Sequence, residues 1–139
     1  MTMTKFNYGE DTLTYSLAFE IAEGKIAAGL SESQKKIISL SRKNVENALK
    51  SDNKIYGLNT GFGVLCSKII SKDEVSQLQK NLIKSHAVGV GDDIPKTISK
   101  LMMILKVHSL SIGYSGVRVN LIERILWQID NNIIPVVPS

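Results

Sequence analysis

Residues 31–50, SESQKKIISLSRKNVENALK, carry the clearest secondary-structure signal in this chain. Ser31 and Gln34 have the spacing of a capping box, in which a hydroxyl and an amide bond the free N–H groups at the start of a helix. The residues that follow place one face of a helix toward a core, because apolar positions recur every three or four residues. These positions are Ile37, Ile38, Ser41, Val45, Ala48 and Leu49. The segment predicts a helix over about residues 31–50.

Four further segments have the same helical period, and the class of fold follows from them. One ends at Gly24, one begins with a second capping box at residues 71–74, one opens at Pro95, and one starts near Val117 and stops at residues 131–132. Strand patterns are short, and no linker divides the chain. We therefore expect one mainly α domain over residues 1–139, with at most a short β element near the N-terminus. The predicted inward positions are Leu13, Leu17 and Ile21; Val75, Leu78, Leu82 and His86; Ile98, Leu101, Met102, Leu105 and Ser109; and Leu121, Ile122, Ile125, Leu126 and Ile129.

Composition excludes several classes of protein. The formal net charge of +4 comes from interspersed charges without long runs of one sign, so nucleic acid is not an expected partner. No apolar run approaches the roughly 20 residues that span a bilayer, and the N-terminus has no signal-peptide pattern. Cys66 is the single cysteine and cannot form an internal disulfide. These features predict a cytoplasmic protein that does not enter a membrane.

Metal and dinucleotide sites are not expected either. His86, His108 and Cys66 stand far apart in the sequence, without the repeated spacing of metal ligands. The segments GFGVLC and GVGDDI each hold a Gly-x-Gly, but both lack the third glycine and the strand-to-helix context of a dinucleotide fingerprint. We predict neither a bound metal nor a nucleotide cofactor.

Residues 56–63, YGLNTGFG, contain the most notable candidate for chemistry. Glycines at three of the eight positions allow backbone turns and close approach of a ligand to the main chain. Tyr56 could be a structural residue in that turn, or a general base, which near neutral pH needs surroundings that favour the phenolate. His86 is similarly open: it could be a core histidine or a ligand contact. Composition alone favours the structural alternative for both residues.

Four motifs together resemble the N-terminal part of the aromatic amino acid ammonia-lyase family. They are IYGLNTGFG at 55–63, LQKNLIKSHAVGVG at 78–91, LKVHSLSIGYSGVR at 105–118 and IIPVVPS at 133–139, in the family's order and spacing. The resemblance runs from about Thr12 to Ser139 and is greatest to the bacterial histidine ammonia-lyases. It implies the helical, fumarase-like fold of that family and assembly of the whole enzyme as a homotetramer.

The resemblance also implies roles for individual residues. Tyr56 matches the family's catalytic base or proton-transfer tyrosine, and Gly63 matches a glycine whose backbone lies near the substrate. Ser85 and His86 match the segment that lines the pocket for the substrate's side chain. A hydroxyl and an imidazole suit a polar ring, so L-histidine is the expected substrate and urocanate the product. Tyrosine ammonia-lyases or aminomutases of the family remain an alternative.

The family's electrophile is a methylidene-imidazolone group built from its own Ala-Ser-Gly tripeptide. In the family that tripeptide follows shortly after the motif matching IPVVPS, whereas this sequence stops at Ser139. We therefore expect an N-terminal fragment that is inactive alone, associates through exposed apolar surface, and has a mobile loop around Tyr56. A non-catalytic helical binding module is the alternative from another class of protein.

Overall fold

The computed structural model describes residues 5–50, 55, 57–58, 60 and 72–139, and this part of the chain is mainly helical, as predicted. It divides into two compact units: the first unit comprises residues 1–44 and 91–139, and the second unit comprises residues 45–90. The expectation of a single domain stays a prediction. In chain order the elements are β1 (Phe6–Asn7), α1 (Tyr15–Ala22), β2 (Ala28–Gly29), α2 (Glu32–Ala48), α3 (Lys72–His86), α4 (Lys96–Ser111) and α5 (Val119–Asp130).

The predicted β element near the N-terminus is a pair of two-residue parallel strands. The N–H of Phe6 donates to the carbonyl of Ala27 at 2.8 Å, and the N–H of Tyr8 donates to the carbonyl of Gly29 at 2.9 Å. The crossover between β1 and β2 is α1, whose first turn is capped by the Thr14 hydroxyl. The pairing carries the ring of Tyr8 into the core, where it is 0% exposed.

The start of α2 confirms one half of the predicted capping box and corrects the other. Ser31 Oγ accepts a hydrogen bond from the N–H of Gln34 at 3.0 Å. The Gln34 side chain does not return to cap Ser31, but donates to the carbonyl of Ser111 at the end of α4. A helix end leaves carbonyls without intrahelical partners, and this buried amide satisfies one of them. Gln34 therefore ties α2 to α4.

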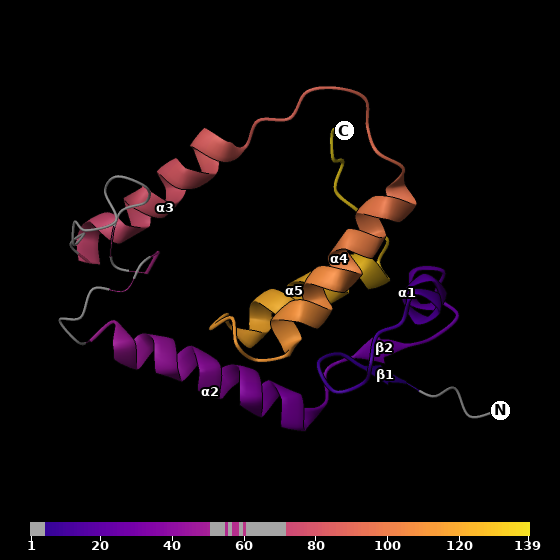
Figure 1. Ribbon diagram of the computed structural model, residues 1–139, viewed down its shortest axis with the longest axis horizontal. Helices are drawn as coiled ribbons and strands as arrows, with labels where there is room; N and C mark the ends of the chain where they lie inside the picture. The colour runs from indigo at the N-terminus through magenta and orange to yellow at the C-terminus, as the bar shows by residue number, and fades with distance from the viewer. Residues whose placement is uncertain (1–4, 51–54, 56, 59, 61–71) are drawn as a thin grey trace. The chain divides into compact units, whose positions relative to one another are not determined.

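The inward face of α4 differs from the predicted one. The buried residues are Ser99, Ile104, Val107, Leu110 and Ser111. The predicted positions Ile98, Met102 and Leu105 are 44%, 49% and 55% exposed, Ser109 is exposed as well, and Leu101 is only partly buried. Apolar residues occur on nearly every side of this helix, so the hydrophobic period did not identify the packed face. Packing against α1 on one side and α5 on another selects that face (Figure 1).

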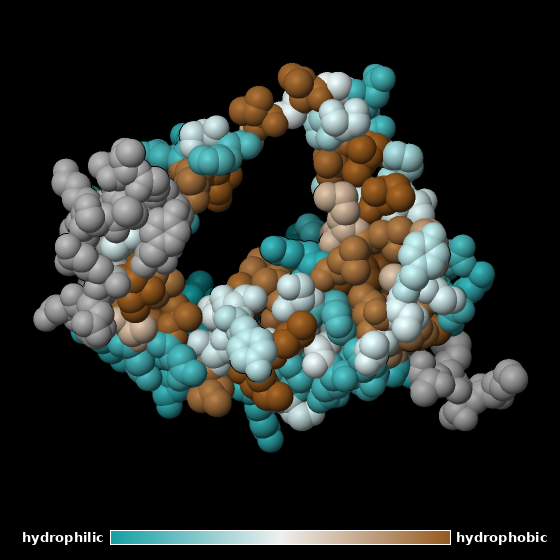
Figure 2. Space-filling model, in the orientation of Figure 1, coloured by the Kyte–Doolittle hydropathy of each residue, from teal (hydrophilic) through white to brown (hydrophobic). Residues whose placement is uncertain are grey.

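The predictions for α5 and α1 agree more closely with the structure. Ile122 and Ile129 of α5 are buried, with Ile125 and Leu126 partly buried beside them, although Leu121 is exposed. Helix α1 is followed by Gly24 with φ of +75°, the conformation expected of a glycine after a helix. Some apolar side chains stay at the surface among polar ones (Figure 2). No helix in the part of the chain that the structure describes is long and apolar enough to cross a bilayer.

Candidate functional site

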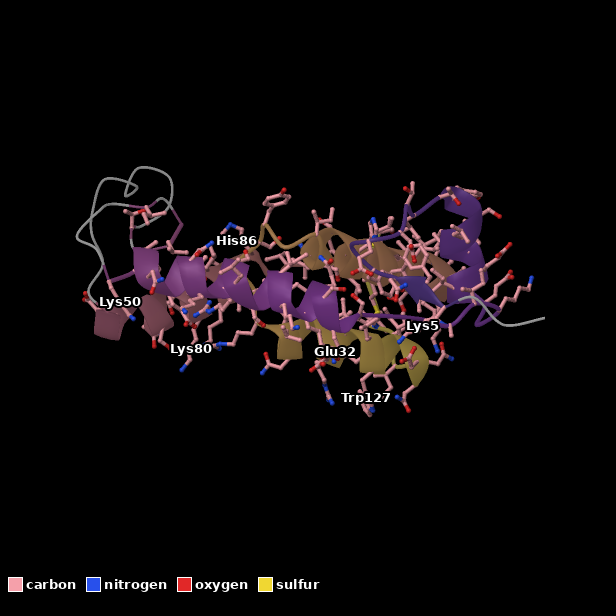
Figure 3. The ribbon with its side chains drawn as sticks, turned by 90° about the horizontal axis from the view of Figure 1, so that it is seen from below. Lys5, Glu32, Lys50, Lys80, His86 and Trp127 are labelled. Carbon is pink, nitrogen blue, oxygen red and sulfur yellow. The ribbon has the colours of Figure 1, made fainter. Side chains whose placement is uncertain are left out.

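The predicted pocket residues Ser85 and His86 lie together at the C-terminal end of α3, in the second unit. His86 is labelled in Figure 3. Both side chains are exposed, so His86 is not a core histidine as the structural alternative required. The Nδ1 atom of His86 lies 2.9 Å from the carbonyl oxygen of Leu82 and 3.0 Å from Ser85 Oγ. Ser85 Oγ in turn donates to the carbonyl of Leu82 at 3.0 Å.

These three contacts favour one tautomer of His86. The Leu82 carbonyl only accepts, and the single hydroxyl proton of Ser85 already points at that carbonyl. The geometry is therefore satisfied when Nδ1 of His86 carries the proton and donates to Leu82 and Ser85. In that tautomer of the neutral ring the lone pair is on Nε2, and the contacts of Nδ1 hold the ring against its own helix.

The other two predicted site residues, Tyr56 and Gly63, lie outside the described residues, and so does the predicted mobility of their loop. Gly57 is described. It adopts φ of +73° in a turn in which the Leu58 N–H donates to the Ile55 carbonyl at 3.0 Å. A positive φ is the conformation for which glycine was expected at this position. The roles of Tyr56 and Gly63 stay predictions.

Two motifs far apart in the sequence pair with each other in the first unit. The N–H of Ile94 donates to the Val137 carbonyl at 2.9 Å, and the N–H of Ser139 donates to the Asp92 carbonyl at 2.8 Å. Gly91 makes room for this pairing, since a Cβ there would lie 2.9 Å from the Ser139 carbonyl oxygen. The segment after the Ser-His motif is therefore held against the IIPVVPS motif.

His108 has a structural role, with a partner that the sequence did not indicate. Its Nδ1 accepts a hydrogen bond from the N–H of Gly9 at 3.4 Å, and its ring lies 6.0 Å from that of Phe6. Burial lowers the pKa of His108 below its usual value of 6.5, so the neutral ring is favoured. His108 fastens the turn after β1 to α4.

The exposed aromatic residue Tyr114 is not among the sequence-based candidates. Tyr114 is 92% exposed on the loop between α4 and α5. Gly113 and Gly116 on either side of it both have positive φ, and the N–H of Gly116 donates to Ser41 Oγ at 3.1 Å. The GYSG motif was the available signal, because glycines on both sides of a tyrosine favour a turn that projects the ring outward. Within the described residues, no group of three His, Cys, Asp or Glu side chains is placed to hold a metal ion.

Comparison with known sequences places these features in a family. Residues 13–139 match the family described as aromatic amino acid lyase. The histidine ammonia-lyase of Halalkalibacterium halodurans is 41% identical over 139 residues, which are 100% of this chain and 27% of that protein. That of Caldanaerobacter subterraneus is 37% identical over 137 residues, 99% of this chain and 27% of that protein. The chain therefore spans about a quarter of the length of these relatives.

Solved structures give the same result for the fold. Histidine ammonia-lyase from Trypanosoma cruzi matches with a TM-score of 0.82 at 26% identity, covering 97% of this chain and 26% of that one. A tyrosine aminomutase from Streptomyces globisporus matches with a TM-score of 0.87 at 25% identity, with the same two shares of coverage. The predicted resemblance is confirmed over nearly the whole chain, and the protein belongs to the aromatic amino acid lyase family.

Proposed function

We propose that this chain is part of an enzyme that eliminates ammonia from L-histidine without oxidation and releases urocanate. The observation that carries the proposal is the 41% identity to a histidine ammonia-lyase over all 139 residues. Relatives of the same name from streptococci are 33–35% identical over 96% of the chain. The family implies that the substrate is an amino acid, and we propose that this amino acid is L-histidine.

The end of α3 supports histidine as that substrate. With Nδ1 of His86 bonded to Leu82, Nε2 can accept a hydrogen bond from the N–H of a substrate imidazole. A polar group that a ligand leaves unpaired lowers affinity for that ligand, so L-phenylalanine would be disfavoured. The hydroxyl of Ser85 supports the ring of His86 in this orientation.

Tyr56 is proposed as the base and Gly63 as the point where the main chain approaches the substrate. The β-proton of an amino acid is weakly acidic, so its removal needs a positioned base together with an electron sink. Tyr56 would take this proton while the bond from the α-carbon to nitrogen breaks and ammonia departs. A tyrosine beside glycines can be positioned on a loop that excludes water when it closes.

The aromatic amino acid lyases use a methylidene-imidazolone group as that electron sink. The 139 residues contain no Ala-Ser-Gly tripeptide, so none of them fits the role of building this group. No step through the group is derived from this chain. The proposed contribution of this chain is substrate binding and proton transfer. The 139 residues alone are expected to release no ammonia.

L-Tyrosine is the second candidate substrate. Its phenol also donates a hydrogen bond that Nε2 of His86 could accept, and tyrosine aminomutases have closely similar folds. We further propose that the whole enzyme is a cytoplasmic homotetramer. The exposed apolar residues Ile98, Met102 and Leu105 along α4 suit burial in such an assembly.

The test compares L-histidine, L-tyrosine and L-phenylalanine with the full-length enzyme that carries this segment, following the absorbance of each unsaturated product. We expect kcat/KM to be highest for L-histidine, and the Tyr56→Phe variant to lose at least about 100-fold, since general base catalysis contributes about 10²- to 10⁴-fold. The 139-residue chain, assayed in parallel, should form no urocanate. A preference for L-phenylalanine, or full activity in Tyr56→Phe, would overturn the proposal.

A further inference from the structure

A second stripe of mostly apolar side chains runs along α4 on the side opposite the buried Val107. Its members recur at spacings of four and three residues, and all of them are exposed: Ile98, Met102, Leu105, Ser109 and Ile112. We call them the outer stripe of α4. Exposed apolar surface of this kind marks a site of interaction. The helical period of the sequence is therefore explained by two faces of α4, one packed in the first unit and one without cover from the described residues.

The spacing of the outer stripe indicates that a helix covers it. A repeat of four and three residues is the heptad spacing, in which side chains of one helix fill the holes on the surface of a facing helix. From Ile98 to Ile112 the stripe is about 21 Å long, at 1.5 Å per residue, so a facing helix needs about 14 residues. Helices α1 and α5 contact α4 and still leave the stripe exposed.

The apolar surface continues from the outer stripe onto α2. Ile37 of α2 is exposed and lies against Gly113, where an added Cβ would be 2.5 Å from Ile37 Cγ2. Gly113 directly follows Ile112, the last residue of the stripe. The end of α4 and the start of α2 therefore contribute to one apolar surface within the first unit.

Charge beside the outer stripe limits what can pack there. Lys106 is exposed next to Leu105, the midpoint of the stripe, and has no ion pair within 4.0 Å in the part of the chain that the structure describes. Helix α4 contains two further lysines and no Asp or Glu. If two copies of α4 paired through their stripes, in either direction, Lys106 of one copy would lie beside Lys106 of the other, and like charges repel. The stripe therefore favours a helix with a carboxylate near its middle over a second copy of α4.

The length of the related proteins indicates where such a helix comes from. This chain corresponds to 27% of the histidine ammonia-lyases of Halalkalibacterium halodurans and Caldanaerobacter subterraneus, so nearly three quarters of each of those proteins lies outside the matched region. A segment of the same polypeptide also has a high effective concentration at the stripe. We propose that a helix from the polypeptide outside these 139 residues packs on the outer stripe of α4 and pairs a carboxylate with Lys106. The inference rests on the proposed function, in which the chain is part of a longer enzyme.

The first experiment uses the full-length enzyme carrying Leu105→Cys. The rate at which N-ethylmaleimide modifies this cysteine is followed by mass spectrometry of its peptide, in buffer and in urea. We expect modification to be at least about 100-fold slower in buffer, because it requires local opening of the packed helices. Equal rates in buffer and in urea would overturn the proposal.

Oxidation of the same variant separates the two kinds of occupant. Two copies of α4 paired about Leu105 would bring the new cysteines together and form a disulfide-linked dimer. We expect Leu105→Cys to give no more dimer on a non-reducing gel than the unaltered enzyme, which retains Cys66 and is the control. A dimer formed only by Leu105→Cys would show that a second copy of α4 occupies the stripe.

The partner of Lys106 is identified in the unaltered full-length enzyme with a carbodiimide, which joins an amine directly to a carboxylate in contact with it. We expect a link from Lys106 to an Asp or Glu beyond residue 139, and loss of that link in the control variant Lys106→Gln. A link only to carboxylates within residues 1–139, or none, would contradict the assignment. Substrate preference is not measured in any of these experiments, so their failure would leave the proposed specificity for L-histidine untouched.

Discussion

The two histidines of this chain lie in opposite surroundings, although both follow an apolar residue pattern on a helix. His108 of α4 is partly buried, contacts the rings of Phe6 and Tyr8, and accepts from the N–H of Gly9. His86 at the end of α3 is exposed, and among the described residues its Nδ1 contacts groups of its own helix. The Nδ1 atom of His108 accepts a bond from another part of the fold, whereas the Nδ1 atom of His86 contacts its own helix, and this leaves His86 as the proposed ligand contact. The role of a histidine is therefore decided by what its nitrogens already bond.

The largest expected difference concerns the helices that carry the two histidines. Ile104 of α4 is 0% exposed, so Ile104→Ala should lower the free energy of unfolding by about 2–5 kcal/mol through lost burial and a residual cavity. Ile83 of α3 is 68% exposed, and Ile83→Ala should change it by no more than about 0.5 kcal/mol. Urea denaturation monitored by circular dichroism measures both. Similar losses in the two variants would show that α3 is packed as tightly as α4.

Replacing the histidines themselves gives a smaller difference in the same direction. His108→Ala leaves the N–H of Gly9 without its acceptor and should lower the free energy of unfolding by about 1–3 kcal/mol. His86→Ala removes an exposed ring and should cost about 0.5 kcal/mol or less. The same denaturation experiment compares the two. A larger loss for His86→Ala would mean that its ring stabilises the fold, and would weaken its assignment as a ligand contact.

The pH dependence of stability should separate the two histidines further. Burial holds the pKa of His108 in the folded chain below the usual 6.5, so the unfolded chain binds more protons between the folded value and 6.5. The contribution of His108 is then full above about pH 6.5 and is lost as the pH falls through that window.

Melting temperatures between pH 7.5 and 5 measure this effect. We expect a decline toward low pH that is reduced in His108→Gln, which cannot take up a proton, and that is unaltered in His86→Gln. A decline of equal steepness in His108→Gln and the unaltered chain would show that other groups cause it.

The smallest effect is expected for Tyr8→Phe in the core beside His108. The Tyr8 hydroxyl has no partner among the described residues, so its removal should lower the melting temperature by no more than about 1–2 °C, and relief of an unpaired buried hydroxyl could raise it. Differential scanning fluorimetry measures this change. A fall of about 5 °C or more would show that the hydroxyl is bonded in the folded protein.

The existence and bounds of the helices could be predicted from the sequence, because capping residues and glycines mark them locally. Helix α2 was expected over about residues 31–50 and is Glu32–Ala48, and α4 was expected to open at Pro95 and begins at Lys96. The packed face of α4 could not be predicted, because its apolar residues surround the helix. The bond from Gln34 to Ser111 was equally hidden, since it joins residues 77 positions apart.

The candidate site was predictable to a similar extent. Ser85 and His86 lie side by side on one helix end, as their adjacency in the sequence requires. The bond of His108 to Gly9 joins positions that are 99 residues apart along the chain. No local pattern connects such residues, so only the folded structure shows them together.

The most direct test of the central claim is the substrate preference of the full-length enzyme carrying His86→Leu. Leucine keeps helical propensity and removes the acceptor at Nε2, while Lys84→Ala on the same exposed helix end is the control. We predict that the ratio of kcat/KM for L-histidine to that for L-phenylalanine falls by at least about tenfold in His86→Leu, the value of one lost polar contact, and stays unchanged in Lys84→Ala. An unchanged ratio in His86→Leu would contradict the account.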